Sequence, residues 1–319
     1  MGENMENIAI IGVGALGKRH LQSMVELQDQ RNIYAVEINE EIIKVLKTEF
    51  PSVNFITTVD ELPDELEVVV IATNSNIRRL LFEQLINHSI VKNIIFEKVL
   101  FQKEEDYYFV HGKLNQLNIN AWVNCARREW DSYKLLKEEL NTCDELHISA
   151  IGGQWGIGCN AIHILDIIEY LSGNEIGTLD ISKLEHNIIE SKRKGFYEFF
   201  GTIVGDCGKC KNYSLTCIDN SNLPFRIEIT TEKSRYMIDE GNNYLLISNE
   251  ESEWKWKKRE FKQVYQSQMT GRVIKSIIDN GTCNLSNYES SMQLHLKYII
   301  PLIDFFKANG MEENVCPIT

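Results

Sequence analysis

The sequence lacks the features that mark membrane, secreted and nucleic-acid-binding proteins. No apolar run approaches the roughly 18 residues that a membrane-spanning helix needs. Residues 1–7 contain neither a basic segment nor a small-residue cleavage site, so we expect no secretory signal. Acidic residues outnumber basic ones by 46 to 33, and the formal net charge of −13 argues against nucleic acid as the main partner.

The cysteines and prolines give no sign of a disulfide framework or a flexible linker. The eight cysteines are scattered along 319 residues, so we expect reduced thiols and a cytoplasmic location. Cys207-Gly208-Lys209-Cys210 has zinc-like spacing, but a structural zinc site needs four ligands and the sequence offers no second pair, so no metal is predicted. Pro301 lies inside the last expected helix and predicts a kink or a break there.

Residues 1–122 alternate short apolar runs with amphipathic stretches. The runs are nearly continuous, as in parallel strands that helices cover on both faces. Five of them predict strands: Asn7–Val13, Ile33–Ile38, Asn54–Ile56, Val68–Ala72 and Ile94–Glu97. Helices are expected between them, for example at Glu40–Phe50 and Arg78–Asn87. This α/β alternation predicts a doubly wound Rossmann domain over residues 1–122.

The pattern changes after about Ala121. A helix, a strand and a second helix are expected in turn: Asp131–Leu140, Glu145–Ile151 and Asn160–Leu171. Strand-like segments separated by turn signals then fill residues 199–261 and indicate a largely antiparallel, open mixed sheet. Two further helices are expected at the end: Val264–Asn280 and Tyr288–Ala308. We assign residues 123–319 to a second, α+β domain, whose last helix is free to pack back on the first.

A glycine-rich turn joins the first strand to the first helix. Gly12-Val13-Gly14-Ala15-Leu16-Gly17 matches the G-x-G-x-x-G fingerprint in the strand-to-helix setting that the fingerprint requires. The glycines allow a tight turn and close approach of a pyrophosphate, and the helix start offers N–H groups to the phosphates. The alternative is a glycine-rich turn that binds nothing. We predict that Gly12, Gly14, Ala15, Leu16 and Gly17 hold a dinucleotide.

Glu37 ends the second predicted strand, 20 residues after Gly17. A carboxylate at this place can bind both ribose hydroxyls of NAD. Against the 2′-phosphate of NADP it costs about 4 kcal/mol at ~4 Å and an effective dielectric of ~20, and less where solvent screens the pair. We therefore expect NAD rather than NADP, the alternative being a solvated glutamate on a loop.

Chemistry-bearing residues follow two later strands and begin one later helix. Ala72-Thr73-Asn74-Ser75-Asn76 and Glu97-Lys98 lie at strand ends, which line the ligand crevice of an open α/β sheet. Lys98 can polarise a substrate oxygen during hydride transfer. Asn160 is a plausible N-cap that puts His163 in the first helical turn, where it can move a proton near neutral pH. A surface lysine and a structural histidine are the alternatives.

Together these motifs resemble the glucose–fructose oxidoreductase and inositol dehydrogenase (Gfo/Idh/MocA) family. The motifs are Gly12-x-Gly14-x-x-Gly17-x-x-His20, Ala72 to Asn76, Glu97-Lys98 and His163-x-x-Asp166. The resemblance implies hydride transfer between nicotinamide and a sugar, inositol or sugar-nucleotide carbon. It implies catalytic roles for Lys98 and His163. It further implies cofactor contacts and substrate contacts from these residues: Thr73, Asn74, Asn76 and Glu97 for the cofactor, Asn160 and Asp166 for the substrate.

The second domain has further features of interest. Residues 124–128 and 315–319 look like a branch found with bacterial surface-sugar synthesis. Arg127 and Arg128 are candidates either for binding a substrate carboxylate or phosphate or for interdomain ion pairs. The alternating Trp254-Lys255-Trp256-Lys257 predicts either a subunit interface or a solvated strand. The family's open sheet often serves dimerisation, so a homodimer or homotetramer through the C-terminal sheet is expected.

Two departures from the family pattern keep other functions open. Val99 replaces the proline of the usual Glu-Lys-Pro motif. Cys159 stands four residues before His163, where many members carry aspartate. Besides a dehydrogenase, the sequence is therefore compatible with redox-neutral epimerisation or glycoside cleavage by tightly held NAD. It is also compatible with a non-catalytic NAD-binding sensor or partner subunit.

Overall fold

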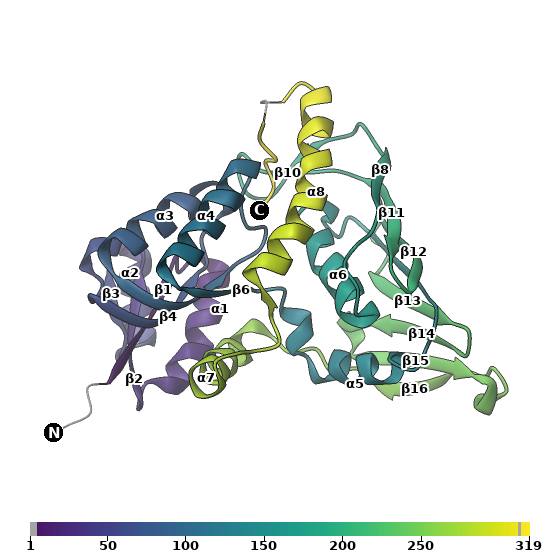
Figure 1. Ribbon diagram of the computed structural model, residues 1–319, viewed down its shortest axis with the longest axis horizontal. Coiled ribbons are helices and arrows are strands. Elements are labelled where there is room, and N and C mark those ends of the chain that lie inside the picture. The colour runs from purple at the N-terminus through teal and green to yellow at the C-terminus, as the bar shows by residue number, and fades with distance from the viewer. Residues whose placement is uncertain (1–4, 312–313) are drawn as a thin grey trace. The chain divides into compact units, whose positions relative to one another are not determined.

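The computed structural model describes residues 5–311 and 314–319, which form two compact units (Figure 1). Unit 1 consists of the described residues up to Asn124 together with Val264–Ser291, and unit 2 consists of Cys125–Gln263 and Met292–Thr319. The boundary after Asn124 lies two residues beyond the predicted end of the first domain at residue 122. The return of residues 264–291 to unit 1 differs from the prediction, which placed them in the second domain.

Unit 1 is built on a parallel sheet with the strand order β3-β2-β1-β4-β5-β6. The strands are β1 (Glu6–Ile11), β2 (Arg31–Val36), β3 (Asn54–Ile56), β4 (Glu65–Ile71), β5 (Ile90–Phe96) and β6 (Asn120–Val123). A short β17 (Ser286–Asn287) pairs antiparallel with β6. The residues of β1 from Ile8 to Ile11 are at most 1% exposed, which explains their continuous apolar run. This order is that of the doubly wound dinucleotide-binding fold and confirms the predicted fold class.

Helices cover both faces of this sheet. They are α1 (Ala15–Met24), α2 (Glu40–Glu49), α3 (Ser75–His88), α4 (Glu104–Leu117) and α7 (Thr270–Asn280). Figure 1 shows α3 and α4 on one side of the sheet and α1 and α7 on the other. The α1–α7 contact returns residues 264–291 to this unit, because Gly271 lies against Ser23 and its N–H donates to Ser23 Oγ at 2.9 Å.

Unit 2 contains a mixed sheet with the order β16-β15-β14-β13-β7-β12-β11-β8. The strands are β7 (Leu146–Gly153), β8 (Leu179–Leu184), β11 (Gly201–Cys207), β12 (Cys210–Ile218), β13 (Arg226–Thr231), β14 (Ser234–Asp239), β15 (Tyr244–Asn249) and β16 (Lys257–Glu260). Strands β7 and β12 run parallel and the other neighbours antiparallel. The predicted open, largely antiparallel mixed sheet is thus confirmed. A small separate ribbon pairs β9 (Ile189–Glu190) with β10 (Tyr197–Glu198).

Three helices accompany the sheet of unit 2. They are α5 (Asp131–Leu140), α6 (Ile157–Ser172) and the greater part of α8 (Tyr288–Ala308). In Figure 1, α6 lies between the sheet and α8. The Tyr298 hydroxyl of α8 lies 3.0 and 2.9 Å from the carbonyl oxygens of Ile157 and Gly158, which ties α8 to the start of α6. Helix α8 runs unbroken through Pro301, so the predicted break at that residue does not occur.

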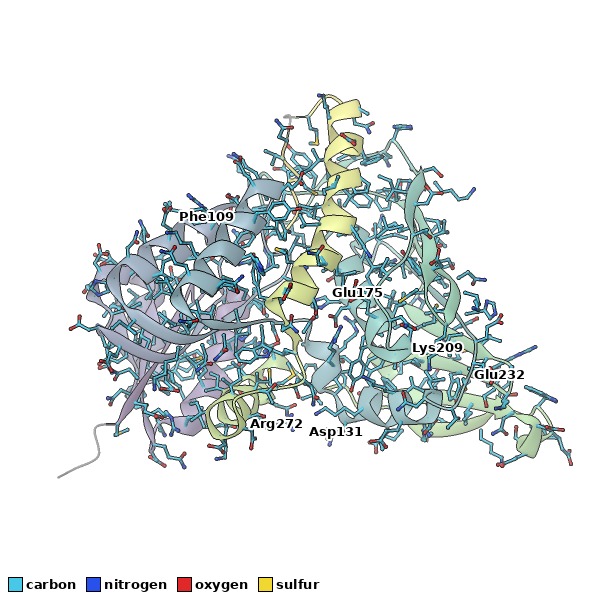
Figure 2. All side chains as sticks on the ribbon, in the orientation of Figure 1. Phe109, Asp131, Glu175, Lys209, Glu232 and Arg272 are labelled. Atoms are coloured by element: carbon cyan, nitrogen blue, oxygen red, sulfur yellow. The ribbon has the colours of Figure 1, made fainter. Side chains whose placement is uncertain are left out.

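The tryptophan–lysine alternation does not form the expected strand. Trp254 has a left-handed φ of 59°, and β16 begins only at Lys257. Trp254 and Trp256 are about half exposed, at 52% and 48%. Figure 2 shows that side chains fill the space between helices and sheet in each unit and extend outward from the surface positions that it labels, such as Glu232 and Arg272. None of the described helices is long and apolar enough to cross a membrane.

Candidate cofactor site and substrate residues

The carboxyl ends of the central strands of unit 1 meet at one edge of the sheet. Backbone hydrogen bonds continue one residue beyond the strands, from Gly12 N to Val36 O at 2.9 Å and from Ala72 N to Ile11 O at 2.9 Å. Glu97 N likewise donates to Ile71 O at 3.1 Å. The strand order reverses between β1 and β4, which is where open α/β sheets bind their ligands. The edge therefore carries the predicted turns of the cofactor site.

Two of the three glycines of the turn are required by the fold. Gly12 has a φ of +90°, and a Cβ there would lie 2.7 Å from Thr73 Cγ2. A Cβ on Gly17 would lie 1.9 Å from the carbonyl oxygen of Gly12. A Cβ on Gly14, in contrast, would meet nothing within 4 Å. The backbone at Gly14 thus borders open space, where a pyrophosphate can approach it closely.

Helix α1 begins at this open space without a side-chain cap. Gly14 is its N-cap residue and has no side chain with which to cap the helix, and the first turn, which includes Ala15, Leu16 and Gly17, carries no acidic residue. Helix α2 is different, because the Asn39 side chain caps it and Glu40 lies in its first turn. The N–H groups at the start of α1 and the positive end of its dipole are therefore available to an anion.

The Glu37 carboxylate lies against the glycine-rich turn, as the sequence placed it. Glu37 Oε2 accepts from Val13 N at 3.0 Å, and Oε1 accepts from Asn39 N at 3.0 Å. Glu37 is half-buried. These two backbone bonds fix an acidic group beside the turn, at the position where the ribose of a dinucleotide is expected.

The residues after β4 and β5 differ in how far their side chains are exposed to solvent. Thr73 and Lys98 are half-buried, whereas Asn74 and Asn76 are exposed at the start of α3. Asn74 occupies the N-cap position of α3, but its side chain does not cap the helix. These side chains therefore lie at the same sheet edge as the glycine-rich turn, and their predicted contacts with a cofactor stay predictions.

Glu97 differs from its neighbours because its carboxylate is buried inside unit 1. It is 3% exposed and is bonded to His20 Nε2 at 2.9 Å and to the Asn124 side-chain amide. Burial pushes the pKa of Glu97 upward, but the bonds from His20 and Asn124 and the charge of Lys98 outweigh it, and the pKa is lowered. The cofactor role of Glu97 stays a prediction. Its carboxylate serves an internal hydrogen-bond network that the sequence did not indicate.

The start of α6 differs from the prediction. The helix begins at Ile157 after Gly156, which has a left-handed φ of 72°, so Asn160 is not the N-cap and His163 is the seventh helical residue, in the second turn. Asn160 Nδ2 donates to Trp155 O at 2.8 Å. The cap comes from Glu198, whose carboxylate accepts from Gly158 N at 2.7 Å and from Cys159 N at 3.2 Å. Local sequence does not reveal this cap, because Glu198 lies about 40 residues away in the chain.

Arg127 and Arg128 both form ion pairs inside unit 2. Arg127 binds Glu240 through two bonds of 2.7 Å, and Arg128 Nε donates to Asp166 Oδ2 at 2.7 Å. Burial raises the pKa of Asp166 although Arg128 opposes the shift. The interdomain interpretation of these arginines is therefore wrong. Substrate contacts of Arg127, Arg128 and Asp166 stay a prediction.

The cysteine pair of the β11–β12 hairpin is not arranged as a metal site. Cys207 and Cys210 face each other across the two strands and are buried. Burial raises the pKa of Cys207 to about 11 and that of Cys210 to about 12, so both are thiols near neutral pH. Among the residues that the structure describes, no group of three or more histidine, cysteine or acidic side chains is placed to hold a metal.

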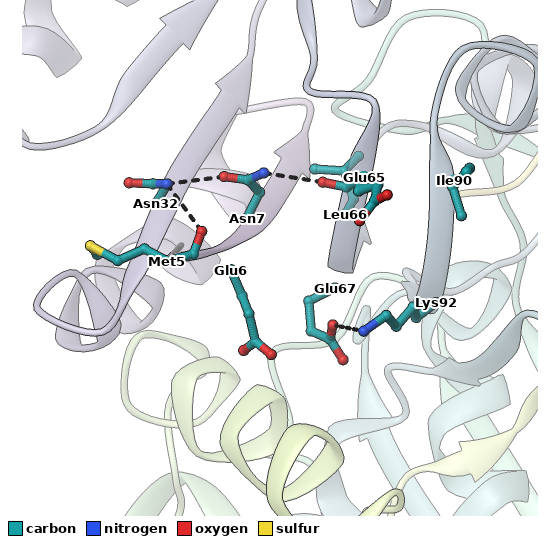
Figure 3. Close-up of a pocket in the computed structure, with 9 residues that line it drawn as sticks. All are labelled: Met5, Glu6, Asn7, Asn32, Glu65, Leu66, Glu67, Ile90 and Lys92. Carbon is teal, nitrogen blue, oxygen red and sulfur yellow. Dashed lines mark hydrogen bonds and ion pairs between the residues drawn. The ribbon is translucent and has the colours of Figure 1, made fainter. Parts of the chain in front are cut away.

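A separate cavity of about 410 Å³ lies at the opposite, amino-terminal edge of the unit 1 sheet (Figure 3). Its lining includes Glu6 and Glu67, and each carboxylate already has a basic partner. Glu6 pairs with Arg31 at 3.0 Å and Glu67 with Lys92 at 2.6 Å. Because the glycine-rich turn lies at the other end of β1, this cavity is distinct from the candidate cofactor site.

Comparison with known proteins agrees with the assignment of unit 1 to a dinucleotide-binding fold. Residues 6–106 match the oxidoreductase family with an NAD-binding Rossmann fold, GFO_IDH_MocA. The resemblance inferred from the sequence motifs is thereby confirmed. No curated protein matches the chain by sequence.

Solved structures with the same fold cover nearly the whole chain. A UDP-N-acetylglucosamine 3-dehydrogenase from Acidithiobacillus ferrooxidans matches with a TM-score of 0.70 and 14% identity, over 92% of this chain and 95% of its own. The scyllo-inositol dehydrogenase from Lactobacillus casei, with bound NAD(H) and scyllo-inositol, matches with a TM-score of 0.68 and 18% identity, over 96% of this chain and 98% of its own. A super-repressor mutant of Gal80p from Saccharomyces cerevisiae matches with a TM-score of 0.71 and 13% identity, over 97% of each chain. At these identities the likeness establishes the fold alone.

Proposed function

Because residues 6–106 belong to the oxidoreductase family with an NAD-binding Rossmann fold, we propose that the chain is an NAD-dependent dehydrogenase or reductase acting on a sugar, an inositol or a sugar nucleotide. The observation that carries the proposal is the open backbone at Gly14, at the start of an uncapped helix and beside the Glu37 carboxylate. A glycine-rich turn that served only the fold would not need open space at its second glycine.

The residues of unit 1 fit a dinucleotide. The backbone from Gly14 to Gly17 would hold the pyrophosphate, and Glu37 would accept bonds from the ribose hydroxyls, which favours NAD over NADP. A bound nicotinamide would supply the carbon that accepts or donates hydride. Thr73, Asn74 and Asn76, which follow the neighbouring strand, are the further candidates for cofactor contacts.

Two side chains are proposed to carry the proton chemistry. In the oxidising direction His163 would take the proton from the hydroxyl oxygen of the substrate. The Lys98 ammonium stabilises the charge that develops on that oxygen, and reduction follows the same path in reverse. Asn160, with Arg127, Arg128 and Asp166, is proposed to contact the substrate.

We further propose that the sheet of unit 2 serves self-association, as a homodimer or homotetramer. Along β7 the residues Ile148 and Ala150 are buried, whereas Ser149 and Ile151, which alternate with them, are half-buried. Small hydroxyl side chains pair across this second face, with Ser214 Oγ donating to Ser149 Oγ at 3.1 Å. A face of small polar and apolar side chains suits contact with an identical face. Light scattering of the purified chain tests this, and a monomer at every concentration would refute it.

Redox-neutral chemistry with tightly held NAD is a second candidate. A non-catalytic sensor or partner subunit is a third, and Cys159 is the residue that favours it. A thiol cannot replace the carboxylate that many family members carry four residues before the histidine. Net formation of NADH from a panel of sugars and sugar nucleotides separates a dehydrogenase from both alternatives. The substitutions Lys98→Ala and His163→Ala must then abolish that activity.

Calorimetric titration of the chain with NAD and NADP tests the cofactor proposal directly. We expect NAD to bind and the Gly14→Val variant to lose binding, because the added side chain fills the space that the pyrophosphate needs. Gly112→Val is the matched control, because a Cβ at Gly112 in α4 likewise meets nothing within 4 Å. Binding of neither dinucleotide to the wild-type chain would refute the proposed function.

A further inference from the structure

A buried arginine connects the two turns that carry candidate site residues in unit 1. Arg78 of α3 is 1% exposed. Its Nη1 donates to the carbonyl oxygens of Val99 and Leu100, the latter at 2.7 Å, and its Nη2 donates to that of Thr73. One guanidinium thus bonds the turn after β4 and the turn after β5. The planar fork of an arginine can serve several acceptors at fixed angles, which a lysine cannot.

On the other side of Lys98, Glu97 belongs to a closed ring of hydrogen bonds. The ring runs from Glu97 to His20 at 2.9 Å and from His20 Nδ1 to Thr270 Oγ1 at 2.9 Å. Gln266 Nε2 donates to Thr270 Oγ1 at 2.7 Å, and Asn124 Nδ2 donates to Gln266 Oε1 at 2.9 Å. Asn124 also donates to Glu97, which closes the ring. Its members come from α1, the ends of β5 and β6, the short turn Gln266–Gln268 and the start of α7.

The ring holds Glu97 in one orientation. Because its pKa is lowered, the Glu97 carboxylate is ionised near neutral pH and can only accept, so the Nε2 of His20 carries the proton between them. His20 and Thr270 are at most 2% exposed, and a buried polar group that lost its partner would be left unsatisfied. The ring therefore resists rotation of the backbone at the end of β5.

Lys98 stands between these two anchors. Glu97 before it is 3% exposed, and Val99 after it is 0% exposed, whereas Lys98 itself is half-buried. We propose that Arg78 and His20 are positioning residues that fix the backbone of Lys98 from both sides, so that its ammonium meets the reacting oxygen in one geometry. This inference rests on the proposed function and adds to it two residues that do not touch the cofactor or the substrate.

The test uses the folded full-length chain and a reagent that needs no known substrate. Acetylation of Lys98 by an N-hydroxysuccinimide ester is followed by mass spectrometry with and without NAD, while calorimetry gives the affinity for NAD. In the wild type, NAD should slow acetylation of Lys98 severalfold. In Arg78→Lys and in Thr270→Val this protection should be largely lost, although both variants bind NAD with affinity close to that of the wild type.

Arg79→Lys is the matched control for Arg78→Lys. Arg79 is the next residue of α3, but it is 32% exposed, pairs with Glu83 at 3.0 Å and lies 4.0 Å from the ring centroid of Phe109, which Figure 2 labels. In the Arg79→Lys variant, NAD should protect Lys98 from acetylation as fully as in the wild type. Thr270→Val replaces one hydroxyl by a methyl group of similar size. It keeps the inference testable if Arg78→Lys fails to fold.

The activity of the same variants gives a second readout. With a substrate identified by NADH formation, kcat should fall by roughly tenfold to a hundredfold in Arg78→Lys while the KM for NAD is retained, because misplacement of about 1 Å is that costly. Unchanged protection and unchanged kcat in both folded variants would overturn the inference and leave the proposed function standing. Failure of the wild type to bind NAD would instead refute the proposed function.

Discussion

The Glu37 carboxylate accepts a hydrogen bond of 3.0 Å from the backbone N–H of Val13, between the first two glycines of the glycine-rich turn. The residue proposed to select the ribose is thus fixed to the turn proposed to hold the phosphates. A change in one is therefore expected to affect the other.

Substitution of Glu37 should change the choice of cofactor. Glu37→Ala removes the carboxylate that would oppose a 2′-phosphate, so the ratio of the NADP to the NAD dissociation constant should fall by up to about a thousandfold. Calorimetric titration with both dinucleotides measures this ratio. Glu40→Ala, an exposed position in the first turn of α2, is the control and should leave the ratio unchanged. An unaltered ratio in Glu37→Ala would exclude Glu37 as the selecting residue.

Removal of the Glu240 charge should destabilise unit 2 in a pH-dependent way. Burial raises the pKa of Glu240, but Arg127 and Tyr133 outweigh it, so the pKa is lowered. The stabilisation by this carboxylate is present above its unfolded pKa and is lost as pH falls through the folded value. Glu240→Gln leaves Arg127 buried without its charge partner and should cost about 3–5 kcal/mol near neutral pH.

Urea unfolding at several pH values measures this effect, and the cost should shrink in acid as the pH falls through the lowered folded pKa of Glu240, because the wild-type carboxylate is then itself protonated. Glu251→Gln, at an exposed position, should cost little at any pH. A cost that stays constant down to acid pH would show that shape, not charge, is what Glu240 contributes.

Glu169 should have the opposite pH dependence. Burial in α6 raises its pKa from 4.5 to about 7, and the bond from Ile176 N opposes the shift only partly. Its contribution to stability is therefore fully present below its unfolded pKa and is lost as pH rises through about 7. Glu169→Gln keeps an acceptor for Ile176 N and should stabilise the chain above about pH 8, by at most about 3 kcal/mol.

The measurement is the urea midpoint of Glu169→Gln against the wild type at mildly acidic and mildly alkaline pH. Glu175 is exposed and provides the control Glu175→Gln. This variant should differ from the wild type in urea midpoint by the same small amount at both pH values. If Glu169→Gln also shows no pH-dependent difference, Glu169 does not titrate as its burial predicts.

The contact between α1 and α7 should depend on a glycine. A Cβ at Gly271 would lie 2.4 Å from the carbonyl oxygen of Ser23, so Gly271→Ala must push the two helices apart at a cost of about 1–3 kcal/mol. Gly112→Ala, in open space within α4, should instead stabilise by about 0.5–1 kcal/mol through helix propensity. Thermal unfolding compares the two, and equal effects would contradict the packing argument.

Much of the fold was predictable because its signals are local. The predicted limits of β3, α5 and α8 agree with the structure to the residue, since burial pattern and helical period are properties of a short stretch of chain. The glycine-rich turn was predictable for the same reason, as its residues act within one turn. Glu37 was predictable from its fixed distance along the βαβ unit.

The errors arose where residues distant in the sequence decide. Asn160 looks like an N-cap, but Glu198 caps α6 from a strand about 40 residues later. Residues 264–291 look like part of the second domain, but Gly271 lets α7 pack on α1. The sequence indicated no role for Arg78 and showed His20 only as the last residue of the glycine-rich motif, because the hydrogen-bond partners of both lie in other elements of the chain.

The sequence by itself determined the glycine-rich turn, the alternation of strands and helices, and the family, since each depends on residue types at short, fixed spacings. Only the tertiary structure decided which charges are buried, which partners they take, and how the backbone around Lys98 is anchored. A hydrogen bond or an ion pair depends on distance in space, and a linear pattern does not record which distant segments the fold brings within 3 Å of one another.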